Sequence, residues 1–139
     1  MVIYWDASAI LSILVEDSHS KKAIRIEKQD GIHLASTLGV AETFAVLKRM
    51  NYENMLPEIL YESAFESFEK SVIRKINTQP DWKVLRKLSS KYVLKGADLW
   101  HLAAVKTIQT ELPEVEILTF DRQLMAAAEK EEVALFEDE

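Results

Sequence analysis

The stretch Val2-Ile3-Tyr4-Trp5-Asp6-Ala7-Ser8-Ala9-Ile10-Leu11 decides the fold. An apolar and aromatic run ends at a carboxylate, and apolar residues then resume at helical spacing. A short unbroken apolar run is typical of a strand buried on both faces of a parallel sheet. The pattern therefore predicts a strand over 2–5, then Asp6, then a helix that begins near Ser8. In open α/β sheets, sites form just beyond the carboxyl ends of the strands, which is where Asp6 falls.

Asp6 has two interpretations at this point. Asp is a preferred N-cap residue, so capping the following helix would be a sufficient reason for its position. A functional site would instead require other acids at equivalent positions along the chain. The remaining sequence decides between the two.

Composition limits the class of protein. The chain has 139 residues, which is enough for one domain with a sizeable core, and we expect residues 1–139 to form a single domain. It has no cysteine, which excludes disulfides and thiolate metal sites. The net charge of −6 argues against a non-specific nucleic-acid coat. No apolar run approaches a membrane span and no signal peptide is evident, so we expect a cytoplasmic protein.

Strand-like and helix-like segments alternate along the chain. We expect strands at 2–5, 32–35, 115–119 and 133–136, with a weaker one within 71–76. We expect helices at 8–15, around 21–28, at 37–50, from Pro57 to Phe68, and at 82–91, 97–108 and 121–130. Residues 51–54 are expected to form a polar break. This alternation predicts an α/β fold, a central parallel β-sheet flanked by α-helices.

Four acids are set inside apolar patterns instead of on polar faces: Asp6, Glu42, Asp98 and Asp121. Each falls at the carboxyl end of an expected strand or in the first turns of an expected helix, which is the same edge of an α/β sheet. The helix dipole favours negative charge there, so a purely structural role is enough to explain each acid separately. One shared site accounts for all four together, and we favour it.

Clustered carboxylates repel one another unless a cation joins them. Two charges about 4 Å apart cost about 4 kcal/mol at an effective dielectric constant near 20. Oxygen ligands without cysteine or a histidine pair suit Mg²⁺ or Mn²⁺ better than zinc. The acids therefore predict metal-assisted hydrolysis of a phosphodiester.

Four short motifs in order resemble the PIN domain family, and more closely the VapC-type toxins of VapBC toxin–antitoxin modules. The motifs are Asp6-Ala7-Ser8, Val40-Ala41-Glu42, residues 94–103 (LKGADLWHLA) and Leu118-Thr119-Phe120-Asp121-Arg122. Together they cover essentially the whole chain. The resemblance implies a PIN-like fold, Mg²⁺- or Mn²⁺-dependent endoribonuclease activity, frequent homodimers and a cognate antitoxin.

The resemblance also assigns roles to residues. It implies that Asp6, Glu42, Asp98 and Asp121 are the catalytic and metal-binding acids, with Ser8 and Thr119 in support. Some members of the family carry another acid about one turn after the third. Here the helix continues His101-Leu102-Ala103, which leaves open whether one or two ions bind.

Five cations recur at and beyond the 82–91 helix: Lys83, Arg86, Lys87, Lys91 and Lys95. A charged stripe is usually a solvated face, but this one leads into Asp98, so the residues are also candidates for binding RNA phosphates. His101 lies three residues after Asp98. A buried, hydrogen-bonded histidine is the favoured interpretation, and tuning of the site is the alternative.

Rival functions are excluded to different degrees. A haloacid dehalogenase-type phosphatase needs a second Asp two residues after the first, where this chain has Ser8. A phosphoacceptor receiver domain needs an acid pair after the first strand, which is also missing. A non-catalytic PIN-like module that binds RNA or protein stays as the alternative to a nuclease.

Overall fold

The computed structural model describes residues 1–137 and confirms the expected α/β class. Its sheet contains four parallel strands in the order β3-β2-β1-β4, namely β1 (Val2–Trp5), β2 (Ile32–Ser36), β3 (Arg74–Ile76) and β4 (Val115–Leu118). The described residues also form seven helices: α1 (Ala7–Leu14), α2 (Ser20–Glu27), α3 (Thr37–Tyr52), α4 (Glu58–Lys70), α5 (Trp82–Lys91), α6 (Gly96–Ile108) and α7 (Arg122–Lys130). None of these helices is long and apolar enough to cross a membrane.

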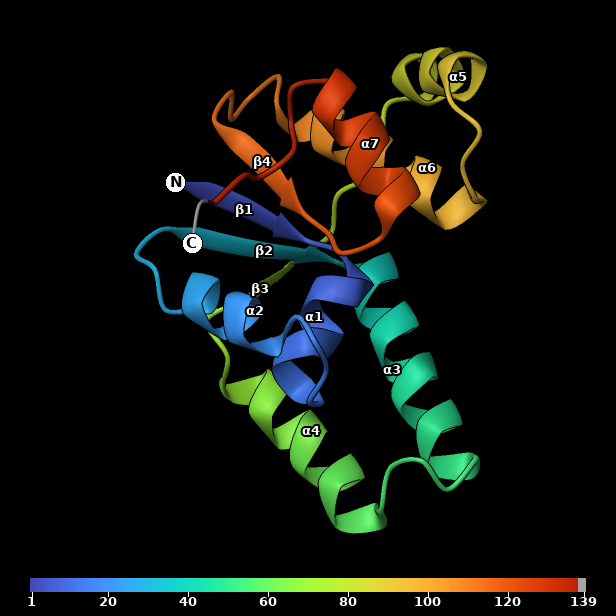
Figure 1. Ribbon diagram of the computed structural model, residues 1–139. Coiled ribbons are helices and arrows are strands. Elements are labelled where there is room, and N and C mark those ends of the chain that lie inside the picture. The colour runs from blue at the N-terminus through green and yellow to red at the C-terminus, as the bar shows by residue number, and fades with distance from the viewer. Residues whose placement is uncertain (138–139) are drawn as a thin grey trace.

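The central strand β1 is buried on both faces, as its unbroken apolar run predicts. Successive side chains of a strand point to opposite faces, so β1 contributes to two cores. Val2 and Tyr4 pack with α5, α6 and α7 on one face, and Ile3 and Trp5 pack with α1, α2 and part of α4 on the other. Figure 1 shows the sheet between these two layers.

Helices α3 and α4 form a long hairpin that extends away from the sheet (Figure 1). A third, smaller core holds them together around Leu47, Leu56 and Ala64. The expected break at 51–54 begins too early, because α3 continues through Tyr52. Asn51 stays helical while its side-chain amide donates to Leu56 O at 3.1 Å, and the chain turns at Asn54 with φ of 61°.

The expected strand at 133–136 is wrong as a full strand. Its pairing is a single parallel bridge between Ala134 and Ile117, made by two backbone hydrogen bonds to Ile117. Val133 and Leu135 are buried, so this segment resembles a strand in pattern. The segment in 71–76 is confirmed only as the short edge strand β3.

The strand order singles out the edge of the sheet where the four acids were expected. From β1 the chain builds β2 and β3 on one side of β1 and then adds β4 on the other side. The order therefore reverses between β1 and β4. Ligands of open α/β sheets bind beyond the carboxyl ends of strands at such a reversal. Asp6 follows β1 there, and Asp121 follows β4.

Candidate active site

Asp6 is a buried carboxylate that receives three hydrogen bonds. It is 3% exposed. Its Oδ1 atom accepts from Ser8 Oγ at 2.6 Å and from Ala9 N at 2.9 Å, and Oδ2 accepts from Thr119 Oγ1. The Ala9 contact is a helix N-cap, so the capping interpretation of Asp6 is correct as far as it goes. Capping involves only one of the two carboxylate oxygens.

The two hydroxyls also join the β1–α1 loop to the β4–α7 loop. Ser8 Oγ accepts from Phe120 N at 2.9 Å, and Thr119 Oγ1 accepts from Asp121 N at 3.1 Å. Each hydroxyl thus accepts a backbone hydrogen from one loop and donates its own to Asp6. The position of Asp6 relative to Asp121 is fixed by this arrangement.

Burial dominates the electrostatics of Asp6. It raises the pKa of the carboxyl, and the hydrogen bonds from Ser8, Thr119 and Ala9 oppose that rise, as does the nearby charge of His101. The net pKa is raised. The folded chain therefore holds this carboxylate at an energetic cost unless positive charge arrives.

Asp121 and Asp98 sit at the starts of two further helices in different ways. Asp121 caps α7 by accepting from Leu124 N at 2.9 Å. Asp98 lies in the first turn of α6, whose N-cap is Lys95 and has no side-chain capping bond. The pKa of Asp98 is raised, first by burial and then by the negative charges of Asp121 and Asp6.

Glu42 also contributes to this raised pKa of Asp98, and His101 opposes it. Asp98 therefore lies within electrostatic reach of the other three acids. The structure brings together at one edge the four acids that the sequence singles out.

Glu42 is held by a buried chain of hydrogen bonds. Its Oε1 atom lies 2.5 Å from His101 Nε2, His101 Nδ1 lies 2.6 Å from Tyr4 Oη, and Tyr4 Oη lies 2.9 Å from Ser36 Oγ. His101 is 1% exposed, as the buried interpretation predicts. With Glu42 ionised, Nε2 carries the hydrogen and donates it to the carboxylate.

Sequence inspection missed the inner part of this hydrogen-bond network, namely Tyr4 and Ser36. In the sequence, Tyr4 resembles one more apolar residue of a buried strand, and Ser36 resembles a helix cap. Ser36 is indeed a cap, because its Oγ atom accepts a hydrogen bond from Gly39 N at 3.0 Å. Burial raises the pKa of Tyr4, and the charges of Asp6 and Glu42 add to that rise. A tyrosine in a fully buried strand was the available signal, because a buried hydroxyl needs a partner.

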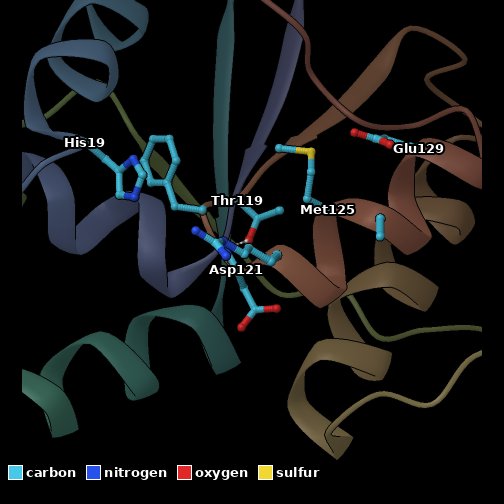
Figure 2. A pocket seen from close by; sticks show the side chains of 8 residues that line it. His19, Thr119, Asp121, Met125 and Glu129 are labelled. Carbon is cyan, nitrogen blue, oxygen red and sulfur yellow. Dashed lines mark hydrogen bonds between the residues drawn. The ribbon is translucent and has the colours of Figure 1, made fainter.

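A hollow of about 340 Å³ lies beside Asp121. Figure 2 shows Thr119 and Asp121 between His19 on one side and Glu129 on the other. The His19 ring stacks on Phe120 with centroids 4.3 Å apart, so His19 belongs to this wall instead of being a free surface group. The exposed Arg122 also lines the hollow and pairs with no described carboxylate.

The acids do not by themselves form a closed coordination shell. Among residues 1–137, no group of three or more His, Cys, Asp and Glu side chains is close enough to hold a metal ion directly. The donor set is nevertheless carboxylate and hydroxyl oxygen, which suits a hard divalent cation. Mg²⁺ keeps several of its waters and needs only one or two direct carboxylates, so widely placed acids fit it.

The cationic candidates lie apart from the acids. Lys83, Arg86 and Lys87 line a surface hollow on α5, together with Trp82 and Ser90. Lys91 pairs instead with Glu131 at 3.3 Å. Lys95 precedes α6 and is the only one of the five next to an acid-bearing helix turn.

Comparison with known proteins agrees with this architecture. The PIN domain model matches residues 3–130. The chain belongs to the PIN domain family. No curated protein matches the sequence.

Three solved structures share the PIN-like fold at low identity. The Mycobacterium tuberculosis toxin VapC20, described as cleaving the sarcin-ricin loop, is 14% identical, with 90% of this chain and 94% of that chain covered and a TM-score of 0.60. FitAcB from Neisseria gonorrhoeae is 17% identical, with 97% and 96% covered and a TM-score of 0.65. A Pyrobaculum aerophilum protein is 18% identical, with 97% and 88% covered and a TM-score of 0.63.

Proposed function

We propose that this PIN domain protein is a metal-dependent endoribonuclease and the toxin of a toxin–antitoxin pair. The observation that carries the proposal is the placement of Asp6, Glu42, Asp98 and Asp121 at the carboxyl edge of the sheet. Burial raises the pKa of Asp98, and the charges of the other three acids add to that rise. Four acids from separate elements share one electrostatic environment, and the charge of His101 offsets only part of their repulsion. Such an arrangement is stabilised by a bound cation.

Asp6, Glu42, Asp98 and Asp121 would hold Mg²⁺ or Mn²⁺ at the β1–β4 edge. When bound, the ion supplies a Lewis acid for the phosphodiester and for the attacking water. The chain itself contributes position. Ser8 and Thr119 orient Asp6, and His101 orients Glu42, as outer hydrogen-bonding partners commonly do for metal ligands.

The hollow beside Asp121 offers room for part of the RNA next to the acids. Arg122 begins α7 on its wall, and its guanidinium can pair with a phosphate in a bidentate manner. An RNA strand that crosses the carboxyl edge of the sheet would place a phosphate between Arg122 and the acids.

The toxin assignment rests on the motif order and on similarity to VapC20 and FitAcB at the level of fold. It includes a cognate antitoxin as protein partner, and a homodimer as the assembly. Co-expression with the small protein encoded next to it should relieve growth arrest caused by this chain. A growth defect that no neighbouring gene relieves would remove the toxin assignment and leave the nuclease assignment intact.

Cleavage of a generic single-stranded RNA tests the nuclease assignment. We expect cleavage with Mg²⁺ or Mn²⁺ and none with a chelator. RNA that is bound but uncut in every divalent metal would instead favour the alternative, a non-catalytic PIN-like module that binds RNA or protein.

A further inference from the structure

Helix α5 carries a positive surface in an acidic protein. Five of the chain's 17 Lys and Arg residues lie between positions 82 and 95, and none of its 23 Asp and Glu residues does. Lys83, Arg86 and Lys87 make no ion pair within residues 1–137. Arg86 is instead oriented along the helix by hydrogen bonds to Ser89 and Ser90.

Trp82 stands within this positive surface and is almost fully exposed. The residue is 81% accessible to solvent and lines an open hollow of about 550 Å³ with Lys83, Arg86, Lys87 and Ser90. None of the described Lys and Arg side chains covers its ring. The apolar face of α5 is formed by Val84, Leu85 and Leu88, so the tryptophan has no part in the core.

An aromatic ring among unpaired cations is the arrangement that binds single-stranded nucleic acid. Bases stack on the ring, and the cations hold the backbone phosphates. An acidic protein surface would satisfy the cations but would not need a flat, open indole ring. A duplex has its bases already stacked within it and would leave the ring unused.

The Trp82 end of the hollow lies well away from Asp98. Asp81 N donates to Thr107 Oγ1 at 2.9 Å, which fixes the start of α5 beside the last turn of α6. Asp98 is at the other end of α6, nine residues earlier, which corresponds to about 14 Å along the helix axis. Figure 1 shows α5 on the outer side of α6, away from the sheet.

We propose that Trp82, Lys83, Arg86 and Lys87 form a second RNA-binding site, which holds an unpaired segment that flanks the cleaved phosphodiester. The proposal rests on the nuclease function and adds to it a requirement for substrate length. The acid edge is the edge of the sheet that carries Asp6, Glu42, Asp98 and Asp121. An RNA long enough to reach from the acid edge to α5 binds at both sites. A shorter RNA binds only at the acid edge.

Fluorescence anisotropy in a chelator tests the site without any cleavage. The probe is a fluorescein-labelled single-stranded RNA of about 12 nucleotides, and a duplex of the same length is the comparison. Trp82→Ala should weaken single-strand binding at least about 5-fold, and Trp82→Phe should restore most of it, because phenylalanine keeps a stacking face. Duplex binding should not change.

Charge-reversal variants provide a second test of the site by the same binding measurement. Lys83→Glu with Lys87→Glu should weaken binding and reduce the salt dependence of log K by about 1.4, which is about 0.7 for each lost phosphate contact. Tyr52→Ala is the matched control, because Tyr52 is also 81% exposed but is the last residue of α3, and Figure 1 shows that end of α3 far from α5. Lys21→Glu on α2 is the control for charge.

The outcomes separate this proposal from the nuclease function. Wild-type affinity of Trp82→Ala for the single strand would overturn the second site, even for a chain that cuts RNA. Loss of binding in Trp82→Ala by a chain that never cuts RNA would support the site and reject the nuclease. In an active chain, Trp82→Ala should raise KM for long RNA and leave kcat unchanged.

Discussion

The strand-end acids and the helix acids at the same edge differ in what holds them. Asp6 and Asp121 each cap a helix, and Asp6 also accepts two hydroxyl hydrogens. Asp98 has no capping bond, and Glu42 bonds only to His101 among the described residues. Helix capping is therefore a sufficient structural reason for the first pair and none for the second.

This difference separates acids that the fold needs from acids that only a functional site explains. A cap stabilises the fold by about 1 kcal/mol whether or not a cation binds. An acid that caps nothing and is repelled by its neighbours destabilises the metal-free fold. Asp98 and Glu42 consequently distinguish an active site from a set of helix caps, and Asp6 is the reference for both.

The largest expected effect is on catalysis, in Asp98→Asn. Removing one charge aimed at the reacting centre should reduce RNA cleavage at least about 100-fold. The free energy of unfolding without metal should stay the same or rise by at most about 1 kcal/mol, because partial exposure screens the repulsion. Cleavage assays and urea melts in chelator measure the two quantities.

Asp30→Asn is the control for this variant, because Asp30 lies before β2, at the opposite edge of the sheet. It should leave both cleavage and stability unchanged. If Asp98→Asn still cleaved RNA, the four acids would not form an active site and would only be residues at helix starts.

A smaller loss of activity is expected when the support of Glu42 is removed. His101→Leu leaves Glu42 without its only described partner, and we expect cleavage to fall about 10–100-fold. His101→Gln keeps a hydrogen-bond donor and should recover part of the rate. Equal losses in both variants would mean that His101 acts only through packing.

Stability should respond at Asp6 more than at Asp98. Asp6→Ala removes a helix cap and leaves the buried Thr119 hydroxyl and the half-buried Ser8 hydroxyl without their acceptor, so we expect a loss of about 1–3 kcal/mol. Asp98→Ala removes no hydrogen bond that the structure records, and we expect almost no change. Similar losses at both positions, measured by urea unfolding in chelator, would contradict the distinction between the two pairs.

The smallest effect is a dependence on pH. The raised pKa of Asp98 means that the folded chain binds a proton more readily than the unfolded chain does. The free energy of unfolding should therefore fall as pH rises from about 4, the ordinary pKa, through the raised value. The fall should stay below about 1 kcal/mol, since the group is partly exposed.

The difference in unfolding free energy between wild type and Asp98→Asn, measured in chelator at each pH, isolates this contribution. A difference that does not change with pH would mean that neither burial nor the neighbouring charges raise the pKa of Asp98.

Periodicity and helix-start chemistry were sufficient to predict most of the fold. The run Val2–Trp5 identified the central strand, and helix α5 was predicted at its observed bounds, Trp82–Lys91. The segment 133–136 was wrongly predicted as a strand because its apolar residues follow a strand-like pattern. That pattern is the same whether the backbone pairs over four residues or at one. Pairing partners are long-range contacts, which local pattern does not encode.

The candidate site was predictable in its acids and less so in its supports. The four acids stood out because each interrupts an apolar pattern. The chain from Ser36 through Tyr4 to His101 was not predictable, since it joins residues up to 97 positions apart. Trp82 could have been noticed, because it falls on the polar face of its helix with Arg86 and Ser90.

Thermal melts of wild type and Asp98→Asn, each with chelator and with Mg²⁺, test the central claim most directly. Binding of the ion to the folded state should raise the melting temperature of wild type and do much less for the variant. The account is contradicted by a wild type that melts at one temperature in both conditions, together with an Asp98→Asn variant that still cuts RNA.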